Sequence, residues 1–281
     1  MPKGAMRMRR DLFVANGAVR LHAILWGTVE PGQTPLVVSP GFWEPAEMAE
    51  DLFAHLGRPG VSVSYRGRGR SDTPEHGYDL GDHVGDLECV VDAAVPGSFC
   101  LLGYSRGGAY ALEYALRHSD RIAGLVLVDQ PPFHTVWPKG SAAPRSAMTH
   151  RGEPILNFFR LRVAHSFEES THRDFTPDLG RIACPVLVLR GTRTDVPIPA
   201  KVDGRMAALY ESALPRVAVV SFAASGHQIP LDEPERYAAV VGAFLARFDD
   251  QRRRALVSDG GGGLLRCRRK SVFRLPGPSP T

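Results

Sequence analysis

The stretch Leu101-Leu102-Gly103-Tyr104-Ser105-Arg106-Gly107-Gly108 places a serine between two glycines in the pattern Gly-x-Ser-x-Gly. An apolar, strand-like run (residues 99–102) precedes the serine, and a helix-like run (residues 109–117) follows it. A serine on so sharp a turn has a strained backbone, and the two glycines leave room for the turn and for close packing of strand against helix. The turn exposes the serine Oγ to a histidine, and the helix N-terminus beneath it favours developing negative charge. The pattern therefore predicts an activated serine at the end of a strand.

On both sides of this turn, strand-like and helix-like runs alternate along the chain. The strand-like runs lie at residues 12–14, 19–26, 36–39, 61–65, 99–102, 122–128, 186–190 and 216–222. Helical spacing of apolar residues is found at residues 45–56, 78–95, 109–117, 199–214 and 234–248. Asn16-Gly17 predicts a hairpin between the first two strands. The alternation predicts an α/β fold, with a mostly parallel eight-stranded sheet that has helices on both faces.

Between residues 130 and 177 the alternation stops. Prolines, aromatic residues and short helical pieces follow one another in this segment. We interpret it as a small helical cap inserted over the carboxyl edge of the sheet, with residues 1–129 and 178–250 as the α/β core. Residues 251–281 hold an arginine triplet, four consecutive glycines and a proline-rich end, a composition that predicts a disordered basic tail.

The charge of the chain is unevenly distributed. With 281 residues, 43% hydrophobic and 23% charged, the composition is that of an ordinary globular protein with a sizeable core. Residues 251–281 hold eight Lys or Arg and one Asp, a formal charge of +7, so the other 250 residues carry −3 of the total of +4. Because the globular part is mildly acidic, we expect a small-molecule substrate rather than a nucleic acid, and the oligomeric state is left open.

Targeting signals and metal motifs are weak in this sequence. No apolar run approaches the roughly 20 residues needed to cross a bilayer. The basic N-terminal segment also lacks the apolar centre of a secretory signal. No Cys-x-x-Cys pair occurs, which favours free thiols at Cys89, Cys100, Cys184 and Cys267 over a disulfide or zinc site. We expect a cytoplasmic protein with no metal and no cofactor.

Two further side chains are candidates to complete the serine site. A serine hydroxyl is a weak nucleophile at neutral pH, so it needs a base within hydrogen-bond reach and a third group that orients the base. In sheets of this type, the acid and then the histidine follow the serine in the chain, each just beyond a strand. His227 follows the strand 217–222 and is the candidate base. Asp195 follows the strand 186–189 and is the preferred acid, while Asp129, at the end of the strand 122–128, is the alternative.

Backbone donors and aromatic side chains complete the expected site. An oxyanion needs preorganised N–H groups, and the amides of Arg106 and Phe42 are the candidates. Phe42 follows the strand 36–39, and the same sequence could instead form a simple turn that ends the strand. Aromatic residues there and in the cap indicate a pocket for a hydrophobic acyl or aromatic substrate, although the same residues could form the core of the cap; these are Trp43, Phe133, Trp137, Phe158 and Phe159.

An arginine-rich run follows the fourth strand. Residues 65–72 read Tyr-Arg-Gly-Arg-Gly-Arg-Ser-Asp, which suggests a phosphate loop or a basic patch. The run lacks the Gly-Lys-Ser/Thr ending of a nucleotide loop, and acidic residues nearby dilute its charge. We predict that it is a structural turn.

Together these residues resemble the α/β-hydrolase superfamily, over about residues 10–250. The motifs that carry the resemblance are Pro40-Gly41-Phe42, the arginine turn at 66–71, Gly-x-Ser-x-Gly at 103–107, and Asp195 followed by Gly226-His227. The resemblance is closest to capped members with a serine nucleophile, such as esterases and perhydrolases. It implies Ser105 as nucleophile, Asp195 as acid, His227 as base, and the Phe42 and Arg106 amides as the oxyanion hole.

The chain departs from the family pattern at two positions. Many relatives have His-Gly where this chain has Pro40-Gly41, and Pro40 removes one N–H and stiffens the loop. Many relatives also have Asp where this chain has Tyr65, which concerns the scaffold more than the chemistry. The nucleophile is a serine, which argues against the carboxylate-based chemistry of haloalkane dehalogenases and epoxide hydrolases.

Three functions are compatible with this sequence. The first is a serine hydrolase that cleaves a carboxylic ester, thioester or lactone of a small hydrophobic substrate through an acyl-enzyme. The second is a cofactor-free C–C bond hydrolase, lyase or cyclase that uses the Ser105/His227 pair. The third is a non-catalytic ligand receptor, against which a complete set of serine, histidine and acid argues.

Overall fold

One eight-stranded sheet forms the centre of the molecule. The computed structural model describes residues 9–136, 147–150, 152–158 and 169–259. The strands are arranged in the order β1-β2-β4-β3-β5-β6-β11-β12. In that order they span Arg9–Asn16, Val19–Trp26, Gly60–Ser64, Leu36–Ser39, Phe99–Tyr104, Ile122–Val128, Val186–Gly191 and Val217–Phe222. β2 pairs antiparallel with both β1 and β4, and all other neighbours are parallel, which confirms the predicted mostly parallel eight-stranded sheet.

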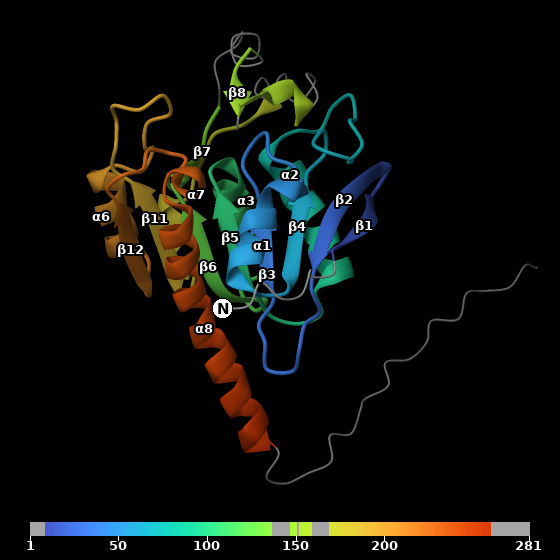
Figure 1. The fold of residues 1–281 in the computed structure, drawn as a ribbon, viewed down its shortest axis with the longest axis vertical. Helices are drawn as coiled ribbons and strands as arrows, with labels where there is room; N and C mark the ends of the chain where they lie inside the picture. Colours follow the sequence, from blue (N-terminus) through green and yellow to red (C-terminus); the bar gives the residue numbers. More distant parts are fainter. Residues whose placement is uncertain (1–8, 137–146, 151, 159–168, 260–281) are drawn as a thin grey trace, which may run out of the picture.

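Helices cover both faces of this sheet (Figure 1). Buried residues of α2 (Leu80–Ala94), α3 (Arg106–Arg117) and α6 (Gly204–Ala213) pack in one core cluster, and those of α1 (Glu50–Leu56) and α8 (Pro234–Asp259) pack in the other. Neighbouring strand residues divide between the two clusters, because successive side chains of a strand point to opposite faces. Leu101 and Leu102 are an example, since they lie in different clusters and are both buried. The near-continuous apolar strands follow from this burial on both sides.

The carboxyl ends of the parallel strands lie beneath an additional layer. Within 130–177, the described residues form two antiparallel ribbons, β7 (Phe133–His134) with β10 (Arg173–Asp174) and β8 (Thr149–His150) with β9 (Glu153–Pro154). They also form the 3₁₀ turns η2 (Ile155–Asn157) and η3 (Thr176–Arg181). Figure 1 shows β7 and β8 beyond the carboxyl edge of the sheet. Ribbons and short turns therefore make up most of the described part of this segment, and residues 137–146 and 159–168, which include most of the predicted helical piece, lie outside the described residues.

The arginine-rich run after β4 is built into the protein interior. Arg66 Nε and Nη2 donate to the two oxygens of the buried Asp86, over 2.9 and 2.6 Å, and Nη1 donates to Gly77 O over 2.7 Å. Arg68 is 1% exposed, and its Nε donates to Phe42 O over 2.8 Å. These contacts agree with the predicted structural turn, and they connect it to the loop that follows β3.

Two element boundaries differ from the sequence prediction. The helix predicted at 199–214 begins only at Gly204, where the Asp203 side chain accepts a hydrogen bond from Met206 N. Residues 199–203 are instead a loop. At the other end, α8 continues to Asp259, so the first nine residues of the predicted disordered tail are helical. The remainder of that tail, residues 260–281, lies outside the described residues.

Two other sequence predictions concern cysteines and membrane spans. Cys89, Cys100 and Cys184 are free thiols, as expected, and Cys267 lies outside the described residues. Within the described part of the chain, no helix combines the length and the apolar character needed to span a membrane.

Candidate active site

Ser105 lies on the turn between β5 and α3. Its backbone has φ 52° and ψ −129°, a conformation that a residue with a Cβ rarely adopts. The flanking glycines are required by space, because a Cβ on Gly107 would lie 2.2 Å from Pro40 O and one on Gly103 would lie 2.5 Å from the Gly108 Cα. The predicted strained turn is therefore present, and it presents the Ser105 side chain at the carboxyl edge of the sheet.

His227 contacts Ser105 directly. The Ser105 hydroxyl donates to His227 Nε2 over 2.8 Å, and both residues are buried. The His227 backbone N–H donates to Ile198 O over 2.9 Å, and the imidazole stacks on the Tyr104 ring with 5.4 Å between centroids. The imidazole is thus held in place by its own backbone and by the residue before the serine.

Asp129, and not Asp195, is the carboxylate that meets the imidazole. His227 Nδ1–H donates to Asp129 Oδ2 over 2.7 Å. Asp129 is fully buried, follows β6 directly and has φ 46°, a left-handed conformation that Asp tolerates better than most residues. Its two oxygens also accept from the backbone N–H groups of Lys201 and Val202, over 2.8 and 3.2 Å. The loop 199–203, where a helix was predicted, supplies these donors and stabilises the negative charge.

The preference for Asp195 as the acid does not agree with the structure. The Asp195 side chain is 74% exposed and forms two hydrogen bonds with Arg193, over 3.1 and 3.0 Å. Both aspartates follow a strand at the carboxyl edge, but Asp129 follows β6, which is the direct neighbour of the Ser105 strand β5. Strand adjacency therefore brings Asp129 to the histidine, and a solvent-facing ion pair holds Asp195 away from it.

The electrostatics favour a neutral imidazole. Burial lowers the pKa of His227 below its ordinary value of 6.5, and the nearby Lys201 charge lowers it further, although the hydrogen bond to Asp129 acts in the opposite direction. The Asp129 carboxylate fixes the proton on Nδ1, so Nε2 is free to accept the Ser105 proton. This is the protonation state that a general base needs at neutral pH.

A cavity of about 480 Å³ opens in front of Ser105 and His227. Phe42 and Arg106, the predicted donors for an oxyanion, both line it, as do Trp43 and Phe133 from the predicted pocket. Phe158 packs edge-on against His150, which lines the cavity, and is not itself part of the lining. Trp137 and Phe159 lie outside the described residues.

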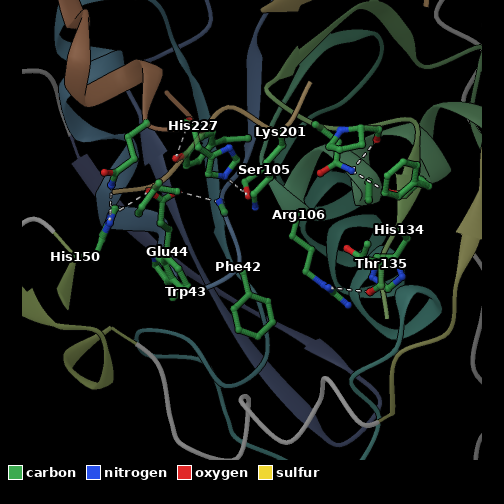
Figure 2. A pocket seen from close by; sticks show the side chains of 18 of the residues that line it. Phe42, Trp43, Glu44, Ser105, Arg106, His134, Thr135, His150, Lys201 and His227 are labelled. Carbon is green, nitrogen blue, oxygen red and sulfur yellow. Dashed lines mark hydrogen bonds and ion pairs between the residues drawn. The ribbon is translucent and has the colours of Figure 1, made fainter. Parts of the chain in front are cut away.

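Polar residues that the sequence analysis did not single out also line this cavity. Glu44, which is buried, accepts from Gly41 N over 2.9 Å through Oε2, and its Oε1 lies 3.3 Å from His150 Nε2. Figure 2 shows Glu44, Trp43 and His150 on one side of Ser105, and His134 and Thr135 on the other. No sequence motif marks these positions, because each depends on the folding of 130–177 against the core. Among the described residues, no group of three or more His, Cys, Asp or Glu is arranged to hold a metal ion.

Comparisons with known proteins concern the sequence family and the fold of this chain. The sequence profile of the alpha/beta hydrolase fold family matches residues 34–147. N-formylmaleamate deformylase of Pseudomonas putida is 23% identical over 83% of this chain and 97% of its own. The 2-(acetamidomethylene)succinate hydrolase of Mesorhizobium japonicum is 30% identical over 73 residues, and this match spans about a quarter (26%) of that protein.

Solved structures extend the likeness over almost the whole described chain. The enol-lactonase of Burkholderia xenovorans superimposes with a TM-score of 0.70 at 18% identity, covering 84% of this chain and all (100%) of that one. An esterase of Exiguobacterium antarcticum gives a TM-score of 0.69 at 20% identity, over 83% and 98%. The family profile thus matches the segment around the Gly-x-Ser-x-Gly turn, and the shared architecture shows that this chain has the α/β-hydrolase fold.

Proposed function

We propose that this protein is a serine hydrolase that cleaves a carboxylic ester, thioester or lactone of a small hydrophobic substrate through an acyl-enzyme on Ser105. One observation carries the proposal, namely the unbroken chain of hydrogen bonds from Ser105 through His227 to Asp129 at the wall of a cavity. Relatives named as a deformylase, an esterase and an enol-lactonase support the hydrolase class.

In the first half of the reaction, Ser105 Oγ attacks the carbonyl carbon and its proton passes to His227 Nε2. The C=O electron pair moves to oxygen, and the amides of Phe42 and Arg106 stabilise the oxyanion. When the tetrahedral intermediate collapses, the C–O or C–S bond breaks, and the alcohol or thiol leaves with the proton from His227. Asp129 keeps its negative charge throughout and stabilises the imidazolium.

In the second half, water replaces the leaving group. His227 takes one proton from the water, and the resulting hydroxide attacks the acyl carbon. Collapse then returns the proton to Ser105 Oγ and releases the carboxylic acid. The same groups serve both halves, so one buried imidazole of lowered pKa is sufficient for the cycle.

Covalent labelling tests this proposal. We expect a fluorophosphonate probe to add once to the wild-type protein, not at all to Ser105→Ala, and much more slowly to His227→Ala, as measured by intact-protein mass. Ester and thioester panels then give kcat/KM for the same three proteins. A folded wild-type protein that neither takes up the probe nor turns over any ester would contradict the proposal and would favour the C–C bond or receptor alternatives.

A further inference from the structure

His134 is a buried histidine in the cavity wall that the proposed reaction does not use. It is the second residue of β7, it is 1% exposed, and it lines the cavity. Figure 2 shows it on the side of Ser105 away from Glu44 and His150. His134 therefore belongs to the wall against which a substrate in this cavity would pack.

The hydrogen bond of one ring nitrogen fixes the chemistry of the other. His134 Nδ1 lies 2.8 Å from Thr171 O, and because a carbonyl oxygen can only accept, Nδ1 must carry the proton. Burial, together with the nearby Arg106 charge, lowers the pKa of His134 to about 4. The ring is therefore neutral at pH 7, and Nε2 carries a lone pair and no proton.

Nε2 has no hydrogen-bond partner although it is fully buried. Most buried polar atoms in proteins have one, so an unsatisfied acceptor in the wall of a cavity needs an explanation. The Tyr110 ring lies 6.0 Å from the His134 ring between centroids, and its hydroxyl also has no hydrogen-bond partner among the described residues. Two other neighbouring side chains direct donors elsewhere. Gln130 Nε2 donates to Pro131 O and Phe133 O, and Arg106 Nη1 and Nη2 donate to Thr135 O and Ser170 Oγ. A donor that arrives with the substrate would satisfy Nε2.

We propose that His134 Nε2 accepts a hydrogen bond from the substrate, and that the enzyme therefore selects acyl compounds that carry a hydroxyl or amide N–H group on the side that faces β7. This inference deepens the proposed hydrolase function and rests on it. A neutral donor fits better than an ammonium group, because the Arg106 cation lies close to the same imidazole. A purely hydrocarbon substrate would leave Nε2 buried without a partner, so the site discriminates against it.

Matched ester pairs that differ by one hydroxyl test the selection. The pairs are methyl hexanoate with its 3-hydroxy and 5-hydroxy forms, and butyl acetate with 4-hydroxybutyl acetate. They place the donor on the acyl side or on the alcohol side of the ester. We expect at least one hydroxylated ester to exceed its parent in kcat/KM by about tenfold or more in the wild-type protein.

Variants at two cavity positions identify the atom responsible. In His134→Phe the preference should fall to about onefold while the parent ester is still hydrolysed, and His134→Gln, which keeps an acceptor, should retain part of it. Met206 lines the same cavity with an apolar side chain, so Met206→Leu is the matched control and should keep the full preference. Thermal melting curves establish that each variant is folded.

Binding without turnover separates this inference from the proposed reaction. The same pairs are titrated into Ser105→Ala, and into Ser105→Ala with His134→Phe, by calorimetry. Tighter binding of a hydroxylated ester that is lost with His134→Phe supports the inference, even if the wild-type protein fails to react with the fluorophosphonate. Equal binding and equal kcat/KM within every pair, or a preference that survives in His134→Phe, would overturn it, and normal labelling of Ser105 would then leave the hydrolase proposal standing.

Discussion

At the scale of single residues, Asp129 and Asp195 differ in their environment rather than in their chemistry. Asp129 is fully buried and accepts three hydrogen bonds, one of them from His227. Asp195 faces solvent and contacts Arg193. A buried acceptor that holds the imidazole tautomer is needed in every turnover of the proposed reaction, whereas an exposed ion pair contributes little.

Paired amide substitutions test this distinction. Asp129→Asn should lower kcat/KM by about 10³–10⁴-fold, because an amide no longer fixes the His227 tautomer. Asp195→Asn should change kcat/KM by less than about twofold. Initial rates on one good ester substrate, with fluorophosphonate labelling rates beside them, provide the measurement. The reverse order of effects would restore Asp195 as the acid.

The sequence predicts the serine and the histidine of this site, but it does not decide which aspartate contacts the histidine. The strained turn at Ser105 and the contact of Ser105 with His227 follow from a local pattern and from chain order, and both are present in the structure. The choice between the two acids does not follow, because each lies just beyond a strand and before the histidine. It depends on which strand lies beside β5 and on the loop 199–203, and both are tertiary features.

At the scale of elements, the buried Arg66–Asp86 ion pair connects the turn after β4 to α2. Besides the two side-chain bonds from Arg66, Asp86 accepts from Arg66 N over 3.1 Å and from Asn16 Nδ2 over 2.9 Å. The contact thus joins β1, the turn and α2 in one network. Removing one partner of such a pair leaves a buried charge without compensation, which is more costly than removing both partners.

A single substitution in this ion pair should therefore remove more stability than a double substitution that replaces both partners. Arg66→Met should lower the free energy of unfolding by about 3–5 kcal/mol, and Arg66→Met with Asp86→Leu should be less destabilised than the single variant. Urea unfolding curves of the wild-type and the two variants give these values. Exposed Arg236, which pairs with Glu233, is the control, and Arg236→Met should change stability by about 1 kcal/mol or less. A loss of stability of similar size in Arg66→Met and Arg236→Met would contradict the special cost of breaking the buried pair.

Helices and strands are predicted well here where the periodicity of apolar residues determines them. They are missed where they form only through pairing between distant segments. All eight strands of the sheet lie close to their predicted positions. The two-residue strands β7 and β10 exist only because residues about 40 positions apart meet, so neither has a periodicity of its own. The extension of α8 beyond residue 250 shows that an arginine-rich sequence can continue a helix.

At the scale of the whole molecule, several imidazoles are buried in the neutral state. Burial lowers the pKa values of His83, His134 and His227, in each case with help from neighbouring positive charge. In the unfolded chain these histidines titrate near 6.5. Between pH 6.5 and the lower folded values, the unfolded state binds more protons, so the free energy of unfolding falls as the pH falls.

We expect the protein to lose up to about 4 kcal/mol of stability between pH 7.5 and 5.5, at about 1.4 kcal/mol for each of the three histidines when it is fully excluded from protonation. Carboxylates with lowered pKa values act only at more acidic pH. Urea midpoints at the two pH values measure the loss. His134→Phe should reduce it by about a third, and substitution of the exposed His76 by Gln should leave it unchanged. Equal or greater stability at pH 5.5 would refute this account.

The two non-glycine residues with positive φ among the described residues are Ser105 and Asp129. Both belong to the hydrogen-bonded chain proposed for the reaction, and each strained backbone costs of the order of 1–3 kcal/mol. In evolutionary terms, selection for activity must maintain this cost at both positions against the pressure for a more stable fold. A descendant that loses the reaction relieves this strain by accepting glycine at Ser105, whereas glycine at Asp129 would leave the buried N–H groups of Lys201 and Val202 without their acceptor. Glycine at position 105 would thus be a sequence mark of lost activity, readable without any assay.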